Sequence, residues 1–394
     1  YAFDAGRISY QFLWGHFQTF QQDWEGVDVA CVLDESHAAY GPACVSTVKD
    51  VLDFHSGHFS KYPYPRLKVI DAGSILAGGY GAPMNIVLHS HVLDSFDYVF
   101  AGVVSHEIGH QWWGGIVSFD LAGGIPATEG LAEFSASLYQ EQRGIYDHAW
   151  GRHAANTLYI ASAAGDVPLS SPSINYAGGS AMTSLIYDKS PAAFHAFHRV
   201  LGDDVFFGAL RSMVLESPGS RTYKDLFDAF VAQGASQDVV DTAIRPWFES
   251  AGHPVLDVRL VAGEDGAMQA TWSRSGMAAP IAFRLPVSYD FGTAASAGTS
   301  FADIAAAASG TCPAGFDALP SYVELDAERG VPVALVPSAA GDANRDGVVD
   351  GFDLLMLARY SGTSAIAGEG FANPLYSDGP DFDGDRDIGD KDLD

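Results

Sequence analysis

The sequence predicts an α+β protein of several domains: a mostly helical domain, then a small β-sandwich, then a C-terminal helical module with calcium loops. Between about residues 47 and 250, apolar residues recur three and four positions apart, which is typical of helices. Between residues 251 and 340 they alternate in short runs separated by turn residues, which indicates strands. From residue 341 to 394, aspartate and glycine dominate. The change in pattern along the chain therefore predicts three structural parts.

A fourth part precedes these three. Residues 1–46 mix short strand-like runs with polar turns, and we interpret them as the remnant of an N-terminal β domain with a lead-in. The chain begins at Tyr1 in what resembles the middle of a domain, so we expect a fragment or a mature form.

The charge of the chain excludes one class of partner. With 21 basic against 49 acidic residues, the net charge is -28, which argues against nucleic-acid binding because that function needs basic patches. No apolar stretch reaches the roughly 18 residues of a membrane helix, so no membrane span is expected.

The cysteines carry no visible chemistry. Cys31 and Cys44 can pair across a short loop if the compartment is oxidising, which would leave Cys312 over. The sequence alone leaves that pairing open.

The stretch VSHEIGHQWW, residues 103–112, contains the strongest chemical pattern. On a helix, His106 and His110 lie on one face, so they can present two imidazoles to one metal ion. Glu107 lies beside them, where a carboxylate can take a proton from water polarised by the metal. The pattern predicts a metal-dependent hydrolase, against the simpler alternative of two polar histidines without a metal.

A catalytic zinc also needs a third protein ligand. Trp113 and Ile116 stand where one class of zinc peptidase has Gly and His, so that class is excluded. The next helix offers Glu129 and Glu133, four residues apart on one face. The residue chemistry alone does not choose between these two carboxylates.

The segment HEIGHQWWGGIVSFDLAGGIPATEGLAEF resembles the signature of the aminopeptidase N family of zinc metallopeptidases, a gluzincin family. In that family eighteen residues separate the second His from the ligand Glu, as they do here between His110 and Glu129. FSKYPYPRLKVI and RPWFESAGHPVLDV extend the resemblance over roughly residues 1–340. It implies a thermolysin-like catalytic domain over residues 47–250 and one zinc ion held by His106, His110 and Glu129, with Glu107 as general base.

The resemblance also implies a tyrosine hydroxyl that holds the oxyanion of the tetrahedral intermediate. Tyr176 is followed by a Gly pair, whereas Tyr187 is followed by Lys189 two residues on. Tyr187 lies nineteen residues before Phe206, which is the family's spacing, so Tyr187 is the expected residue. Pro191 departs from the family pattern, but a proline is tolerated in a first helical turn.

The family's substrate strand, Gly-x-Met-Glu-Asn, is altered here. Its Glu binds the free amino group of the substrate, and the matching stretch is GGYGAPMNIVL, residues 78–88. Alignment on Asn85 puts Met84 at the Glu, and alignment on the following apolar pair puts Ala82 there. We expect Gly81, Ala82 and Met84 to border a peptide or protein substrate, with altered recognition of the N-terminal amine.

Two calcium-loop patterns occur in the acidic tail, so one or two calcium ions are expected. The spacing and the following leucines resemble a type I dockerin, which implies a cohesin-type scaffold as partner. Arg386 occupies the glycine position of the second loop, and the chain stops at Asp394 before a second helix. The expected calcium ligands are Asp342, Asn344, Asp346, Asp353, Asp381, Asp383, Asp385 and Asp392.

Taken together, these patterns predict a secreted or extracellular zinc peptidase, attached to a scaffold or cell surface through its tail. The alternative is a non-catalytic zinc-binding paralogue that acts as a peptide-binding or scaffold-anchored protein. All the catalytic residue types are present, which favours the enzyme, whereas the altered substrate strand keeps the alternative open.

Overall fold

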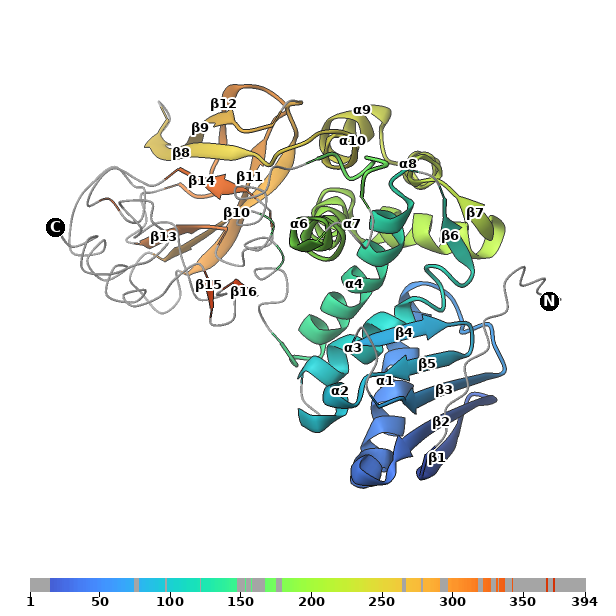
Figure 1. Ribbon diagram of the computed structural model, residues 1–394. Helices are drawn as coiled ribbons and strands as arrows, with labels where there is room; N and C mark the ends of the chain where they lie inside the picture. The colour runs from blue at the N-terminus through green and yellow to red at the C-terminus, as the bar shows by residue number, and fades with distance from the viewer. Residues whose placement is uncertain are drawn as a thin grey trace.

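The computed structural model describes residues 15–73, 78–95, 98–120, 122–146, 153, 157, 167–174, 179–263, 267–277, 279–290, 297–317, 322–326, 331, 333–336, 342, 366–367 and 371–372. Figure 1 shows a sheet near the N-terminal end, helices at the centre, and smaller sheets near the C-terminal end. The chain is thus a mixed helix and sheet protein, as the sequence predicts.

Five strands form the N-terminal sheet in the order β1-β2-β3-β5-β4. Strands β2, β3 and β5 run parallel, and the edge strands β1 and β4 run antiparallel to their neighbours. Among the described strands β4 pairs with β5 alone, so its outer edge carries no strand partner in that part of the chain. The bounds are β1 (Phe17–Trp24), β2 (Val27–Asp34), β3 (Arg66–Asp71), β4 (Gly79–Ala82) and β5 (Asn85–Leu88).

Helix α1 (Gly41–His58) follows the 3-10 turn η1 (Glu35–Tyr40) and connects β2 to β3. Its buried face packs on β1 and β2, and it also contacts α3. The domain limit predicted at residue 46 falls inside this helix, between two strands of one sheet. Strands β1 to β5 therefore share one sheet, and α1 covers it.

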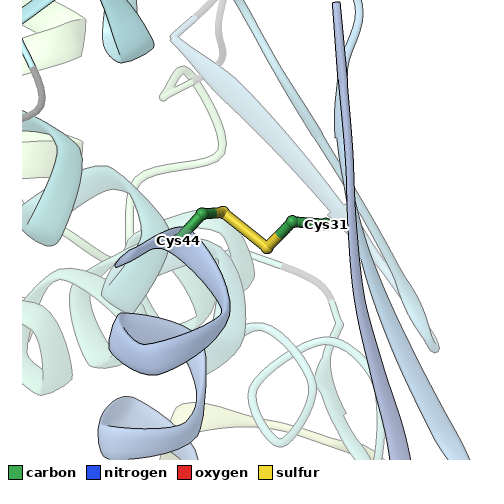
Figure 2. Close-up of a disulfide and its surroundings, with 2 residues drawn as sticks. All are labelled: Cys31 and Cys44. Atoms are coloured by element: carbon green, nitrogen blue, oxygen red, sulfur yellow. A yellow bond between two sulfur atoms is a disulfide. The ribbon is translucent and has the colours of Figure 1, made fainter. Parts of the chain in front are cut away.

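A disulfide joins Cys31 on β2 to Cys44 in the first turn of α1 (Figure 2). Their Cα atoms lie 6.5 Å apart, and both residues are fully buried. The pairing that the sequence left open is present in the structure, and Cys312 keeps a free thiol. Closing a loop of this length restricts the unfolded chain and is worth about 3 kcal/mol.

The central helices pack in series: α3 (Tyr98–Gly109) on α4 (Gly124–Gln142), and α4 on α7 (Ser190–Glu216) (Figure 1). A Cβ built on Gly109 would lie 3.2 Å from the Cα of Ala132, so this glycine allows α3 and α4 to approach closely. The remaining helical segments are α2 (Ser90–Ser95), α6 (Gly179–Ser184), the π-helical turn η2 (Leu185–Lys189), α8 (Tyr223–Ala232), α9 (Gln237–Val239), the π-helical turn η3 (Val240–Ile244) and α10 (Arg245–Glu249).

Helix α3 is shorter than its apolar pattern suggests. The periodicity continues to Gly115, but the helix ends at Gly109, and Gly114 has a left-handed φ of 112°. The chain then turns into β6 (Val117–Phe119), which pairs in parallel with β7 (Gly219–Arg221). The reversal places the beginning of α4 beside the end of α3.

Two small sheets follow the helices, one ordered β12-β9-β8-β14 and the other β11-β10-β13. Apolar side chains of both sheets are buried, and α7 contacts β10. The bounds are β8 (Val255–Ala262), β9 (Met268–Ser275), β10 (Phe283–Asp290), β11 (Gly298–Ile304), β12 (Ser309–Pro313), β13 (Tyr322–Leu325) and β14 (Ala334–Leu335).

Beyond these sheets the structure describes Asp342, which is buried, and the paired strands β15 (Ile366–Ala367) and β16 (Phe371–Ala372). The seven other predicted calcium ligands lie outside the described residues. None of the helices described here has the length and apolar character needed to cross a membrane.

Candidate metal centre and active site

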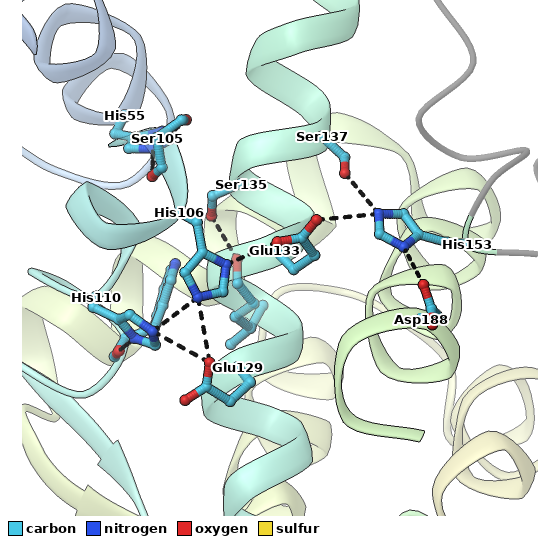
Figure 3. Close-up of polar contacts among 12 residues, drawn as sticks. His55, Ser105, His106, His110, Glu129, Glu133, Ser135, Ser137, His153 and Asp188 are labelled. Atoms are coloured by element: carbon cyan, nitrogen blue, oxygen red, sulfur yellow. Dashed lines mark hydrogen bonds and ion pairs between the residues drawn. The ribbon is translucent and has the colours of Figure 1, made fainter. Parts of the chain in front are cut away.

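Three predicted ligands converge at the contact between α3 and α4 (Figure 3). The Nε2 atoms of His106 and His110 lie 3.1 Å apart, and each lies 3.3 Å from the Oε2 of Glu129. His106 belongs to α3, His110 follows its last residue, and Glu129 belongs to the second turn of α4. The three side chains could hold one metal ion, with Glu129 as the carboxylate, and they are called the metal-binding group below.

Both imidazoles are oriented by acceptors on their far side. The Nδ1–H of His106 donates to Glu133 Oε2 at 2.8 Å, and the Nδ1–H of His110 donates to the carbonyl oxygen of Trp113 at 2.9 Å. A carboxylate and a carbonyl only accept, so each Nδ1 carries a proton, and each Nε2 can offer its lone pair to a metal when the imidazole is neutral. The orientation therefore directs both lone pairs at the centre of the group.

The charges on the metal-binding group and on Glu133 favour a cation between the three converging side chains. Burial opposes ionisation of Glu129, yet hydrogen bonds with His106 and His110 lower its pKa well below the usual range. Burial likewise opposes protonation of His106, yet Glu129 and Glu133 raise its pKa well above the usual range. Two ionised carboxylates beside two converging imidazoles thus attract a cation.

Glu107 lies next to this group and is buried. Its Oε2 makes no hydrogen bond within the part of the chain that the structure describes. Burial raises the pKa of Glu107, against the lowering effect of His106 and His110. A buried carboxylate with a free oxygen is suited to exchanging a proton with a small molecule bound beside it.

The edge strand β4 passes directly over Glu107. A Cβ built on Gly79 would lie 2.7 Å from Glu107 Oε1, and one on Gly81 would lie 2.8 Å from the Glu107 carbonyl oxygen. Only glycine leaves enough room at these two positions. Gly81, which the sequence predicts to border the substrate, therefore sets the distance between β4 and the carboxylate.

We predict that Gly81→Ala lowers kcat/KM by about 100-fold, because a displacement of about 1 Å near reacting groups has this effect. The added methyl must push β4 away from the backbone of Glu107. Gly57→Ala on α1 is the matched control, since a methyl there meets nothing within 4 Å. Peptide-cleavage kinetics of both variants check the prediction, and equal activity of the two would contradict it.

Tyr187 lies on the π-helical turn η2, with its ring centroid 6.0 Å from that of His106. Its side chain, together with His106, Glu107, Gly79 and Val103, lines a cavity of about 390 Å³. The predicted tyrosine thus lines the same cavity as His106 and Glu107, whereas Tyr176 lies outside the described residues. A π-helical turn is rare and frequently occurs at functional sites.

Gln111 holds the turn that joins β4 to β5. Its Nε2 donates to the carbonyl of Ala82 at 2.9 Å, and its Oε1 accepts from the N–H of Met84 at 2.8 Å. Met84 has a left-handed φ of 67°, and its side chain is half-buried against the core. Met84 is one of the two positions that align with the amine-binding Glu of the family. It presents an apolar side chain in a turn that is held by the hydrogen bonds of Gln111.

Four residues near the metal-binding group make contacts that the sequence motifs do not predict. Gly79 approaches Glu107, and Glu133 orients His106, whereas the sequence suggests Glu133 only as a candidate ligand. His153 and Asp188 continue the contacts beyond Glu133. The four-residue spacing from Glu129 to Glu133 was a usable signal for Glu133, but His153 stands in no motif.

His55 supports the active-site end of α3 from α1. Its ring is fully buried, and Nε2 donates to the carbonyl oxygen of Ser105 at 3.0 Å. Burial lowers the pKa of His55 from 6.5 to about 4, despite that hydrogen bond. The folded protein therefore keeps this imidazole neutral at a pH where the unfolded chain protonates it.

We predict that the stability contributed by neutral His55 is complete above pH 6.5 and declines as the pH falls toward 4, by up to about 3 kcal/mol. Urea unfolding of the metal-free protein from pH 7.5 to 4 measures this. His55→Gln should flatten the pH dependence, whereas replacing the exposed His16 by Gln should leave it unchanged. An identical pH profile for His55→Gln and the unaltered protein would refute the assignment.

Fold and site together place a candidate metal-binding group across two packed helices, α3 and α4. The model of the peptidase family M1 domain matches residues 44–247, just over half of the chain. The chain therefore belongs to peptidase family M1, in agreement with the resemblance to aminopeptidase N.

Similar proteins are aminopeptidases. An alanine/arginine aminopeptidase of Saccharomyces cerevisiae is 23% identical over 237 residues, covering 56% of this chain and 27% of the relative. A probable M1 family aminopeptidase 1 of Encephalitozoon cuniculi is 24% identical over 322 residues, covering 73% and 34%. A membrane alanyl aminopeptidase of Manduca sexta is 28% identical over 197 residues, covering 44% and 19%. The chain spans about a third or less of the length of these curated relatives.

Proposed function

We propose that this chain hydrolyses peptide bonds in a zinc-dependent, aminopeptidase-like reaction. One observation carries the zinc assignment. Zinc bonds of about 2.0–2.1 Å in a tetrahedron separate neighbouring ligand atoms by about 3.3 Å. The three atoms of His106, His110 and Glu129 are 3.1–3.3 Å apart, and two nitrogens with one carboxylate oxygen are a donor set typical of catalytic zinc.

Each side chain has a defined task in this proposal. Bound zinc would supply Lewis-acid polarisation of the carbonyl and water oxygens. Glu107 accepts the proton of the attacking water on its free Oε2 and passes it to the leaving amine. The hydroxyl of Tyr187 donates a hydrogen bond to the oxyanion.

The edge of β4 supports a docking mode for the substrate. An extended peptide can add to an open strand edge through main-chain hydrogen bonds. Gly79 and Gly81 keep this edge close to Glu107, so a peptide bond laid along β4 would reach the carboxylate.

Recognition of the substrate amine is proposed to differ from that of the family. A carboxylate discriminates a free ammonium group, and an apolar side chain cannot. Met84 and Ala82, the two residues that align with the family's Glu, are both apolar. We therefore expect weak discrimination between peptides with free and with blocked N-termini.

Zinc analysis and peptide cleavage test the proposal together. The protein should contain one zinc ion, lose activity to a chelator, and regain it when zinc is added back. It should cleave free and N-acetylated peptides at rates within about tenfold, since no ionic contact of about 1.4 kcal/mol or more separates them. Bound zinc with no cleavage of either peptide would instead favour the non-catalytic, peptide-binding alternative.

The tail and the compartment complete the proposal. The two calcium-loop spacings support calcium binding by residues 341–394 and attachment to a cohesin-type scaffold. The disulfide between Cys31 and Cys44 supports a secreted protein, because such bonds persist in oxidising compartments. Calcium titration of the full chain and of the Asp346→Ala variant, measured by calorimetry, tests the tail. Equal calcium uptake by both proteins would contradict calcium binding by the first loop.

A further inference from the structure

A line of buried polar contacts leads away from the metal-binding group (Figure 3). It starts at the hydrogen bond of 2.8 Å between His106 Nδ1 and Glu133 Oε2. The other oxygen of Glu133, Oε1, lies 3.4 Å from Nε2 of His153. Nδ1 of His153 in turn lies 3.1 Å from Oδ1 of Asp188. One histidine thus stands between two carboxylates, and it can donate to both of them only as the imidazolium, with a proton on each ring nitrogen.

The sequence of α4 explains the first half of this line. Glu129, Glu133 and Ser137 are four residues apart, so they lie along one face of the helix. The first belongs to the metal-binding group, the second orients His106, and the hydroxyl of Ser137 lies 2.9 Å from Nε2 of His153. This face of α4 therefore leads from the metal-binding group to His153.

The second half ends on the π-helical turn η2. Asp188 is the residue after Tyr187, and its carboxylate accepts from the Nδ1–H of His153. The side chain of His153 is 2% exposed, and its two carboxylate partners are also shielded, with side-chain exposures of 18% for Glu133 and 16% for Asp188. Shielded hydrogen bonds of this kind hold their partners more firmly than exposed ones.

We propose that His153 is a positioning residue that aligns two catalytic elements at once. Through Glu133 it orients the imidazole of His106, and through Asp188 it holds the turn that carries Tyr187. The inference rests on the proposed function, because it concerns the zinc ligand and the oxyanion donor of that reaction. His153 itself touches neither substrate nor metal.

His153 has two contacts, one with Glu133 (the Glu133 arm) and one with Asp188 (the Asp188 arm). Losing each contact should have a different effect. Loss of the Glu133 arm frees the ring of His106 to rotate, and loss of such an outer contact weakens metal binding by about 10- to 100-fold. Loss of the Asp188 arm leaves the zinc ligands in place but displaces Tyr187, so kcat falls with little change in KM. His153→Ala should show both effects, Glu133→Gln chiefly the first, and Asp188→Asn only the second.

The experiment uses the full chain and two readouts besides activity. Zinc affinity is measured by competition with a chromophoric chelator, and affinity for a peptide phosphinate, an analogue of the tetrahedral intermediate, by calorimetry. His153→Gln, whose amide can donate to one carboxylate at a time, should recover part of both losses. His91→Ala, an exposed histidine on α2, is the matched control and should change neither.

A double-mutant cycle with Tyr187→Phe isolates the second arm. If Asp188 acts through the tyrosine, Asp188→Asn adds little to the loss of phosphinate affinity already caused by Tyr187→Phe. The proposal is overturned if His153→Ala lowers only the melting temperature and leaves zinc and phosphinate affinity unchanged. If the unaltered protein does not cleave peptides, only the proposed function is overturned. The zinc and phosphinate affinities of the variants can still be compared, so they still test the role of His153. If the unaltered protein binds no zinc, both proposals fall.

Discussion

Glu107→Gln should lower kcat by about 10²- to 10⁴-fold, the usual contribution of a general base. Glutamine keeps the shape of the side chain beneath β4, so Gly79 and Gly81 still fit against it. Its amide cannot accept a proton from water, however, so the step assigned to the carboxylate is lost. KM should change little, because the docking edge is unaltered.

Zinc content must be measured in the same samples. Glu107 is not one of the three converging side chains, so Glu107→Gln should retain one zinc ion per chain. Glu216→Gln, at an exposed carboxylate at the end of α7, is the control and should remain fully active. Normal kcat in Glu107→Gln would exclude this carboxylate as the base, whereas loss of zinc would show that it holds the site together.

Tyr187→Phe should lower kcat by about 10²- to 10³-fold, as expected when one donor to an oxyanion is removed. Phenylalanine preserves the packing of the ring near His106, so zinc binding should not change. The effect belongs to the transition state, where the oxyanion forms, and KM should stay within a factor of about two.

Steady-state kinetics on one peptide substrate separates this role from simple packing. The control is Tyr223→Phe, which removes a hydroxyl that donates to Glu249 at 3.2 Å, between α8 and α10. A raised KM with unchanged kcat in Tyr187→Phe would indicate ground-state binding instead of oxyanion stabilisation. Equal kinetics of the two variants would remove Tyr187 from the catalytic group.

The metal-binding group was predictable because its determinants are local. His106 and His110 are one helical turn apart, and the fixed length of the connection brings the next helix against α3. The choice between Glu129 and Glu133 needed more than helical spacing, since both lie on the same face of α4. The resemblance made that choice, and the structure brings Glu129 to the two Nε2 atoms.

Contacts between distant segments were not predictable in the same way. The approach of β4 to Glu107 depends on the order of strands in the sheet, which the glycines at 79 and 81 do not specify by themselves. His153 meets Glu133 and Asp188 through tertiary packing alone. Strands β11 and β12 contain many Ala, Gly and Ser residues, so they show little of the apolar alternation by which the other strands were found.

Gln111 has a consequence for cooperation within the site. It directly follows His110, and its amide bonds both sides of the turn at Ala82 and Met84. The conformation of this short segment that positions His110 for a metal therefore also fixes, through Gln111, the position of β4, the proposed docking edge. If zinc raises the affinity for a peptide on β4 through this contact, thermodynamic reciprocity requires the peptide to raise the affinity for zinc by the same factor. Substrate would then help to retain the metal during turnover, and an idle molecule would lose it sooner.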